Sequence, residues 1–456
     1  MLSDPIVALA TPPGRAALAV IRLSGDGAFE VAAKVIASFR VEPSRRATLA
    51  MFLDPTGQPA DRGLYTVFPG PVSYTGEDMV ELSCHGGLVA PARIIAALGA
   101  AGARQAFPGE FTRRAVLNGK LDLVQAEGVG DLVDATAPEQ ARLALQQLDG
   151  ALSRRLARLR DGLLELEALL SYDIDFPEED EGPLVPTRAP DHLDRLAAEI
   201  DGLIATAPAG ERIREGALVV FAGRPNTGKS SLFNSLLGLD RAIVTDIPGT
   251  TRDAIESATE FHGWPVRLVD TAGLRHVVEP VELLGIEVSR RYLSAADLVL
   301  FCVEAGRELD DQEQAWLRGY PGDGDSTEAR LRPGARVLAV RTKADLAADA
   351  EDGIAVSVTT GAGLDVLRRE VARIAFAEQW QLADLEPVLT RERHREALRR
   401  SQEALGQARP LLVGRGEAVL AAHHVHEAVR ALDELIGAVD VEDVLDRVFA
   451  SFCVGK

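Results

Sequence analysis

The amino-acid sequence predicts a multidomain α/β protein in which a doubly wound, mostly parallel sheet is inserted into a helical domain. Its 456 residues would make about three domains of ordinary size. Apolar runs alternate with helical stretches between residues 213 and 377, as in doubly wound sheets. Helical periodicity precedes this part and returns after it, so the two flanking helical segments are expected to pair in space.

Residues 1–118 are expected to form an α+β N-terminal domain. Four short runs rich in strand-forming residues predict β-strands, and the stretches between them combine helical patterns with loops that contain Pro and Gly. The predicted strands are residues 6–9, 18–22, 63–67 and 79–82.

Residues 119–212 are expected to form the first half of the helical domain. Leucines recur every three or four residues over residues 145–170, which predicts one amphipathic helix of about seven turns. The acidic segment 175–181 is expected to be a solvated loop, and a second helix is predicted over residues 191–205. Residues 378–456 are predicted to be the second half of the same domain.

A phosphate-binding motif follows the first strand of the part spanning residues 213–377. Apolar runs predict strands at residues 217–221, 266–269, 298–303 and 337–340. Residues 223–230 (Gly-Arg-Pro-Asn-Thr-Gly-Lys-Ser) match G-x-x-x-x-G-K-[ST] and precede a predicted helix over residues 231–237. In such a loop backbone N–H groups surround phosphate oxygens, Lys229 reaches the terminal phosphates, and the Ser230 hydroxyl is a ligand for Mg²⁺.

Two further motifs follow later strands. In residues 270–273 (Asp-Thr-Ala-Gly), Asp270 can hold Mg²⁺ through water and Gly273 can present its N–H group to a γ-phosphate. In residues 342–345 (Thr-Lys-Ala-Asp), the Asp345 carboxylate can accept both N–H groups on the Watson–Crick edge of guanine, at about 1.5–3 kcal/mol each. Adenine does not offer that pair, so the motifs together predict a Ras-like P-loop GTPase domain.

The residue after the Asp-Thr-Ala-Gly motif is Leu274, where many GTPases of the Ras type have a glutamine that orients the attacking water. A leucine side chain cannot form that hydrogen bond, so another residue must orient the water. The acidic candidates nearby are Glu279, Glu282 and Glu287.

Composition limits the classes of partner. The chain is 46% hydrophobic and 26% charged, as in ordinary globular proteins, which excludes a disordered or fibrous chain. With 49 Lys and Arg against 69 Asp and Glu, the net charge is −20, so a broad basic surface for nucleic acid is not expected. An RNA or DNA partner would dock at a local basic patch or through a second protein.

Cysteine usage and segment hydrophobicity favour a cytoplasmic protein. Cys84, Cys302 and Cys453 lie far apart in the sequence, without the spacing of a disulfide framework or a zinc site. The first residues lack the basic region of a signal peptide, and the chain contains no apolar run long enough to span a membrane.

Motifs spread over nearly the whole chain resemble the bacterial tRNA-modification GTPase MnmE (TrmE) family. The most specific of them is the ending Cys-Val-Gly-Lys, in which Lys456 excludes the alternative of a prenylated CaaX box. The matching segments are residues 10–15, 21–25, 73–78, 85–87, 108–112, 118–122, 223–230, 246–253 and 452–456.

The resemblance implies that the N-terminal domain binds 5-formyl- or 5,10-methylene-tetrahydrofolate and forms a homodimer. The residues that match the folate-binding positions are Arg22, Glu81, Lys120 and Lys456. A carboxylate can accept hydrogen bonds from the pterin edge, and the glutamate tail of folate requires cations.

The resemblance also implies a potassium ion in place of an arginine finger. Asn226 matches the side-chain ligand, and Thr245, Ile247 and Thr250 match the loop that completes the cage. Ser230 and Thr251 match the Mg²⁺ ligands, and Glu282 matches the glutamate that orients water. The expected GTP-contacting residues are Asn226, Thr227, Gly228, Lys229, Ser230, Ser231, Thr245, Thr250, Thr251, Asp270, Thr271, Ala272, Gly273, Thr342, Lys343, Asp345 and Ser357.

The reaction implied by the resemblance needs two partners, tRNA and the FAD-containing protein MnmG, with which the homodimer would form a heterotetramer. Together they would install an aminomethyl-type (carboxymethylaminomethyl) group at C5 of the wobble uridine. GTP hydrolysis would drive association and dissociation of the GTPase domains. Cys453 is a candidate participant in this chemistry or, equally, a small apolar residue in a packed tail.

Two departures from the family pattern affect the guanine site. Thr342 occupies the position where Asn is usual. That Asn braces neighbouring loops, so its replacement places the affinity for the nucleotide in question. Val358 occupies a position where Ala is common.

Two alternative functions are compatible with parts of the sequence. A regulatory GTPase switch, in ribosome assembly or coupled to a transporter, would share the nucleotide motifs but not the folate-like N-terminal block or the Cys-x-Gly-Lys ending. A stand-alone folate-dependent transferase would explain residues 1–120 and leave the GTPase domain without a role.

Overall fold

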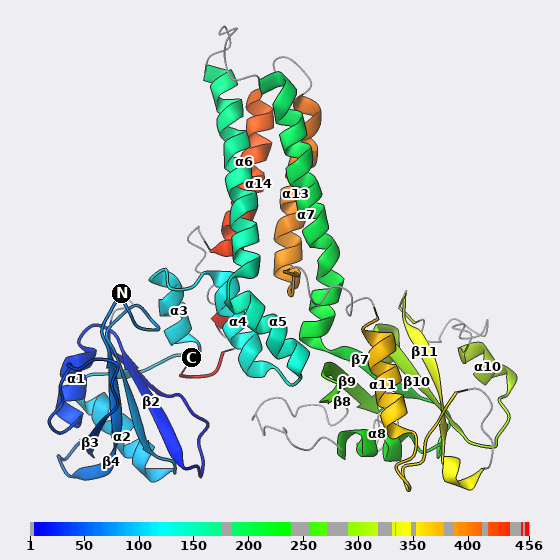
Figure 1. Cartoon of the computed structure of the whole chain (residues 1–456), viewed down its shortest axis with the longest axis horizontal. Coiled ribbons are helices and arrows are strands. Elements are labelled where there is room, and N and C mark those ends of the chain that lie inside the picture. Colours follow the sequence, from blue (N-terminus) through cyan, green and yellow to red (C-terminus); the bar gives the residue numbers. More distant parts are fainter. Residues whose placement is uncertain are drawn as a thin grey trace, which may run out of the picture. The chain divides into compact units, whose positions relative to one another are not determined.

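The computed structural model describes most of the chain (Figure 1) as two compact units. Unit 1 consists of Met1–Gly130, Gln147–Leu164 and His426–Lys456, and unit 2 of Asp131–Gln146 and Glu165–Val425. The described residues are 4–175, 185–238, 256–270, 291–317, 331–332, 334–347, 353–377, 387–412, 418–437, 448–449 and 452–455. Within these ranges, no helix combines the length and the apolar character that crossing a membrane requires.

Unit 1 contains a six-stranded sheet in the order β3-β4-β5-β2-β1-β6, antiparallel except where β6 runs parallel to β1. Its strands are β1 (Ile6–Leu9), β2 (Leu18–Ser24), β3 (Thr48–Leu53), β4 (Pro59–Phe68), β5 (Met79–His85) and β6 (Arg104–Gln105). Residues alternate between the two faces of a strand, so Ile21 and Leu23 enter the core with α1 (Ala28–Val35) and α2 (Val89–Ala101), and Arg22 faces the other way, opposite Glu81.

The four predicted strands of this domain are confirmed, but β3 and β6 were not predicted. β6 is only two residues long. In β3 the side chain of Leu49 is exposed while Phe52 is buried, so apolar residues lie on both faces and the alternating pattern of a half-buried strand is lost.

The prediction of one helix over residues 145–170 is wrong, because two helices meet there. Helix α5 (Pro138–Leu148) ends before Gly150, whose φ of 77° a right-handed helix does not allow, and α6 (Ala151–Asp175) begins directly after it. The Gln125 side chain donates to the Leu148 carbonyl at 2.9 Å and so satisfies one carbonyl at the helix end. Within α6 the leucine periodicity holds: Leu152, Leu156, Leu159, Leu163, Leu166 and Leu170 are all at most 2% exposed.

The second helix of this region is longer than the predicted residues 191–205. Helix α7 (Val185–Glu215) continues through Pro208, although a proline inside a helix costs about 3 kcal/mol. Ala207, Ala209 and Ile213 are buried around it, and that packing offsets the cost. Unit 2 packs α13 (Glu392–Leu411) along α7 (Figure 1), and α14 (Ala418–Ile436) is the last long helix of the chain that the structure describes.

Unit 2 contains a second six-stranded sheet in the order β12-β11-β10-β7-β9-β8, parallel except for the edge strand β8. The strands are β7 (Ala217–Ala222), β8 (Glu256–Phe261), β9 (Trp264–Asp270), β10 (Leu298–Glu304), β11 (Arg336–Thr342) and β12 (Ile354–Ala355). Val219 and Phe221 pack with α8 (Lys229–Gly238) and α11 (Leu364–Ala375), whereas Leu218 and Val220 pack with residues from other segments, including Leu317 at the end of α10 (Asp311–Leu317). Both faces are covered, which confirms the doubly wound fold.

Candidate functional site

The phosphate-binding loop connects β7 to α8, as predicted. All six residues of β7 are buried, so the strand fixes where the loop begins. Gly223 has a φ of 129°, and a Cβ atom there would lie 2.3 Å from the Cys302 carbonyl oxygen, so only glycine fits this close approach to β10. Gly228 (φ 86°) and Asn226 (φ 64°) also adopt left-handed conformations, which turn the loop back toward the helix.

Lys229 lies within the curve of the phosphate-binding loop. Its side chain is 7% exposed, and Nζ donates to the carbonyl oxygens of Gly223 at 2.9 Å and Arg224 at 2.5 Å. Ser230 and Ser231 follow, exposed, in the first turn of α8, where free N–H groups and the helix dipole favour an anion. This arrangement fits the phosphates of a nucleotide: a cation within the loop and a helix N-terminus beside it.

Asp270, the last residue of β9, pairs in register with Phe221, the residue before the end of β7. Its side chain is 7% exposed. The sheet therefore brings this carboxylate to the strand end from which the phosphate-binding loop departs. The other predicted residues of this region lie outside the described residues: Thr245, Ile247, Thr250, Thr251, Thr271, Ala272, Gly273, Glu279, Glu282 and Glu287.

Two loops that follow β11 and β12 are tied together at the predicted guanine site. The Ala344 N–H donates to the Val356 carbonyl at 3.1 Å. Ser357 is 1% exposed, and its Oγ accepts the Thr360 N–H at 3.2 Å, which closes the second loop. Asp345 is exposed in the first loop, and Lys343 forms an ion pair with Glu304 at 3.2 Å.

Thr342 supplies a brace of its own at the position where the family usually has Asn. Its Oγ1 donates to the Thr227 carbonyl at 2.6 Å and lies 3.3 Å from the Val303 carbonyl. The side chain is 3% exposed, so water does not replace these contacts readily. A hydroxyl group therefore connects the guanine loop to the phosphate-binding loop, beside Asn226.

We expect Thr342→Val to weaken GDP binding by about 5- to 150-fold. Valine has nearly the shape of threonine but leaves the buried Thr227 carbonyl without its donor, at a cost of about 1–3 kcal/mol. Titration with a fluorescent GDP analogue measures the change, and Thr342→Ser, which keeps the hydroxyl, is the matched control. Equal affinities of the valine variant and the unaltered protein would show that the brace contributes nothing.

The predicted folate residues Arg22 and Glu81 meet on adjacent strands in unit 1. Arg22 Nε lies 2.9 Å from Glu81 Oε1, and both side chains are about a quarter exposed. Arg22 Nη1 also donates to the Gly455 carbonyl at 3.4 Å, and its guanidinium lies 5.6 Å from the centre of the Tyr74 ring. Sequence reasoning did not select Tyr74, although it lies in the matching segment 73–78.

Lys120 contacts the loop that contains Tyr74. Its Nζ donates to the Pro71 carbonyl at 3.1 Å, and its side chain passes Gly76, where an added Cβ would lie 3.3 Å from Lys120 Cγ. The structure thus brings Lys120 and Arg22 to the same loop. The fourth predicted residue, Lys456, lies outside the described residues.

Residues 452–455, here called the tail segment, belong to unit 1 and dock there on the segments around Leu9 and Pro108. Gly109 donates its N–H to the Cys453 carbonyl at 3.4 Å, and Val454 forms a β-bridge with Pro108. Gly455 has a φ of 100°, and a Cβ atom there would lie 2.5 Å from the Leu9 carbonyl oxygen, so a larger residue would push the segment away from β1.

Cys453 is exposed, whereas the other two cysteines are buried. Burial raises the pKa of the Cys84 thiol to about 11 and that of the Cys302 thiol to about 12, so these two remain protonated and unreactive near neutral pH. Cys453 is therefore the accessible thiol among the three cysteines of the sequence.

Two family models match the chain in consecutive segments. The model described as "GTP-binding protein TrmE N-terminus" matches residues 5–120, and "MnmE helical domain" matches residues 123–453. Among solved structures, the G domain of the T. maritima FeoB iron transporter is similar to 35% of this chain and 98% of its own length, at 25% identity and a TM-score of 0.24.

Curated relatives match over the full length. The "tRNA modification GTPase MnmE" of Neisseria meningitidis serogroup B (strain ATCC BAA-335 / MC58) is 42% identical over 99% of this chain and 98% of its own length. The protein of the same name from Phenylobacterium zucineum (strain HLK1) is 42% identical and covers 100% of both chains. Both family models and both relatives agree, and the chain belongs to the MnmE (TrmE) family of tRNA modification GTPases.

Proposed function

We propose that this protein is a potassium-dependent GTPase that, with FAD-containing MnmG, installs an aminomethyl-type (carboxymethylaminomethyl) group at C5 of the tRNA wobble uridine in the cytoplasm. The observation that carries the proposal is the presence in one chain of a guanine-nucleotide site and the Arg22–Glu81–Gly455 cluster. A regulatory GTPase switch would need only the first of these. The domain boundaries 118/119, 212/213 and 377/378 are part of this proposal.

In the proposed GTPase site, Lys229 stabilises charge on the terminal phosphates, and Ser230 and Thr251 hold Mg²⁺. The residues proposed to hold potassium are Asn226, Thr245, Ile247 and Thr250. Asn226 supports this assignment because its amide is exposed on the phosphate-binding loop. Glu282 is proposed to orient the attacking water, since leucine at position 274 cannot.

In the proposed folate site, the Glu81 carboxylate accepts hydrogen bonds from the pterin edge. Arg22, Lys120 and Lys456 supply the positive charge that a glutamate tail requires. The contacts of Arg22 with Glu81 and with the Tyr74 ring, and of Lys120 with the Pro71 carbonyl, support this assignment. They hold Glu81 beside Arg22 and bring both cations to one loop of unit 1. Cys453, in the tail segment, is proposed to take part in the modification chemistry.

The proposed homodimer is supported by apolar side chains on the sheet of unit 1. Leu49 and Leu64 pair directly across β3 and β4 and are 57% and 43% exposed. On β5, Ser83 pairs with Leu64, and His85, two residues further along the strand, pairs with Leu18. Leu18 is 61% exposed. Alternation along the strands places all three leucines on one face, and exposed apolar patches mark interaction surfaces.

The nucleosides of tRNA from cells that lack this protein test the proposal. We expect the modified wobble uridine to disappear and to return when the intact protein is supplied, but not with Lys229→Ala. Mass spectrometry of digested tRNA measures this. An unchanged nucleoside profile in the deletion strain would favour the regulatory switch.

We expect Arg22→Ala to weaken binding of 5-formyl-tetrahydrofolate by at least about 10-fold, because hydrogen bonds to charged groups contribute about 1.5–3 kcal/mol. Equilibrium dialysis measures the dissociation constant, and removal of Lys456 should have a similar effect. Arg62→Ala, an exposed arginine on β4 of the same sheet, is the matched control and should bind normally. Absence of binding to the intact protein would contradict the folate site.

A further inference from the structure

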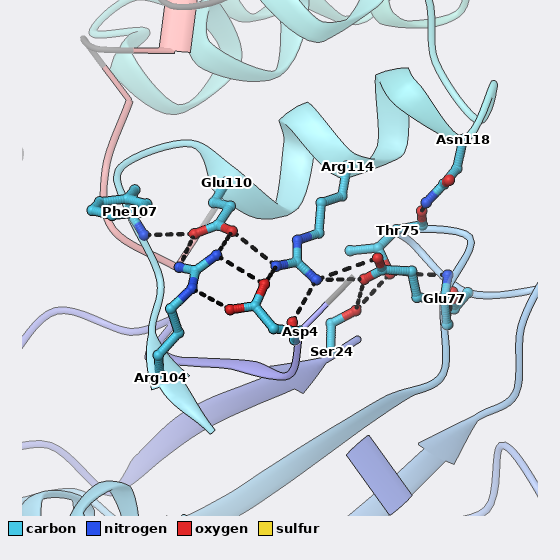
Figure 2. A network of polar contacts seen from close by, with 10 residues as sticks. Asp4, Ser24, Thr75, Glu77, Arg104, Phe107, Glu110, Arg114 and Asn118 are labelled. Carbon is cyan, nitrogen blue, oxygen red and sulfur yellow. Dashed lines mark hydrogen bonds and ion pairs between the residues drawn. The ribbon is translucent and has the colours of Figure 1, made fainter. Parts of the chain in front are cut away.

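A network of charged residues with a buried centre connects α3 (Glu110–Leu117) to the loop that contains Thr75 and Glu77 in unit 1 (Figure 2). At its centre is Arg114 of α3, which is 1% exposed. Nη2 donates to Glu110 at 2.9 Å and to the Asp4 carboxylate at 3.2 Å, and Nη1 donates to Glu77 at 3.1 Å and to the Asp4 carbonyl at 2.9 Å. Removing one partner of the buried Arg114–Glu110 pair would leave the other charge buried and uncompensated, which is strongly destabilising.

One arm of the network reaches the segment on which the tail segment docks. Glu110, 2% exposed, accepts the Phe107 N–H at 2.9 Å and is bound by Arg104. Burial alone would raise the pKa of Glu110, but these hydrogen bonds and those of Arg114 lower it, so the carboxylate stays charged. Residues 107–109 are thereby held in place, and Pro108 and Gly109 receive the tail segment.

The other arm reaches the loop of the proposed folate site. Glu77 accepts from Ser24 Oγ at 3.1 Å, and Ser24 Oγ lies 2.7 Å from Thr75 Oγ1. The Thr75 carbonyl accepts from the Asn118 side chain at 2.7 Å (Figure 2). Tyr74, between these contacts, lies against Arg22, so this arm shapes the loop that surrounds the candidate folate residues.

Arg114 thus contacts Glu110, which holds the segment that receives the tail segment, and Glu77, which holds the loop that contains Tyr74. The tail segment and this loop both contact Arg22. We propose that Arg114 is a positioning residue through which docking of the tail segment and the conformation of loop 71–77 depend on each other. The inference rests on the proposed folate site, whose two walls these segments form. Such coupling is reciprocal: a folate bound at the loop tightens tail docking by the same factor by which the docked tail tightens folate binding.

A spin label on Cys453 tests the coupling without any ligand. The intact protein takes one label, because Cys84 and Cys302 are buried. The contacts of Glu77 given above are with Arg114, Ser24 and its own loop, and the label sits on the tail segment. If the two segments are coupled, Glu77→Gln should still increase the mobile fraction of the label. We expect an increase of at least about five-fold, the lower end of ordinary coupling factors. Asp54→Asn, which breaks the ion pair with Arg93 elsewhere in the domain, is the matched control and should leave the spectrum unchanged.

Arg114→Lys keeps the charge but cannot donate to three carboxylates in the same geometry, so it should loosen the label in the same direction. If either variant fails to fold by circular dichroism, Ser24→Ala removes the hydrogen bonds of Ser24 Oγ to Glu77 and Thr75, leaves the contacts of Arg114 in place, and should give a smaller change of the same sign. Folded variants whose melting temperature falls while the label spectrum at 25 °C stays unchanged would overturn the proposal.

Addition of 5-formyl-tetrahydrofolate separates this inference from the proposed function. In the intact protein the ligand should reduce the mobile fraction, and in Glu77→Gln this effect should be lost. Binding that leaves label mobility unchanged in the intact protein would overturn the coupling while leaving the folate site in place. If the intact protein does not bind the ligand, the folate site is wrong, and the ligand-free comparison still decides whether the two segments are coupled.

Discussion

GTP hydrolysis by this protein is expected to fall about 1,000-fold when potassium is replaced by sodium at equal ionic strength. A fixed cation between the β- and γ-phosphates offsets the charge that develops there, and an arginine finger in that role contributes about 10³–10⁵ in rate. Arg224, the arginine within the phosphate-binding loop, does not supply this charge, because its guanidinium pairs with Asp310 and Glu313 at the start of α10. Asn226 of the same loop is exposed and is the proposed side-chain ligand.

Steady-state phosphate release in the two salts measures this effect. Asn226→Ala should lower the rate in potassium to the sodium rate while leaving GDP affinity within a few-fold, since Lys229 and Asp345 are unchanged. Equal rates of the intact protein in potassium and sodium would remove the proposed cation site and leave the charge stabilisation to Lys229 and Mg²⁺.

The GTPase half of the fold could be predicted because its signals are local in sequence. A buried strand, a glycine-rich loop and a helix occupy consecutive residues from Ala217 to Gly238, and each has its own pattern. The break at Gly150 was missed because the leucine spacing continues across it; only the positive φ of the glycine ends the helix. At Pro208 the prediction ended a helix that in fact continues. A proline is tolerated inside this helix because the residues around it are buried, and the sequence does not show that burial.

The site shows the same division. Lys229 and Ser230 follow from a motif, and Arg22 with Glu81 follow from resemblance. Arg114 could not be identified from one sequence, because its partners Asp4 and Glu77 approach it from segments far apart in the chain. The contact of Thr342 could be predicted only in part. The sequence shows a threonine where Asn is usual, but only the structure places its hydroxyl against the Thr227 carbonyl.

Asp345→Asn is expected to weaken GTP binding by about 10²–10⁴-fold and to favour xanthosine triphosphate instead. The carboxylate accepts two N–H groups from guanine, each worth about 1.5–3 kcal/mol, and an amide can accept only one of them while its NH₂ group opposes the other. Xanthine has a carbonyl where guanine has the amino group, so the amide would then donate to it and recover the second bond. Asp345 is exposed at the loop tied to Val356, and the change should leave the fold intact.

Competition binding with GTP and xanthosine triphosphate measures this reversal, and the same variant distinguishes specificity from stability. A loop that had merely lost its conformation would bind both nucleotides poorly, whereas a changed recognition edge exchanges one for the other. Asp365→Asn, an exposed carboxylate in α11 of the same domain, is the matched control and should prefer GTP as before. If Asp345→Asn keeps its preference for GTP, the guanine edge is recognised elsewhere, and the brace from Thr342 would then support a loop that does not select the base.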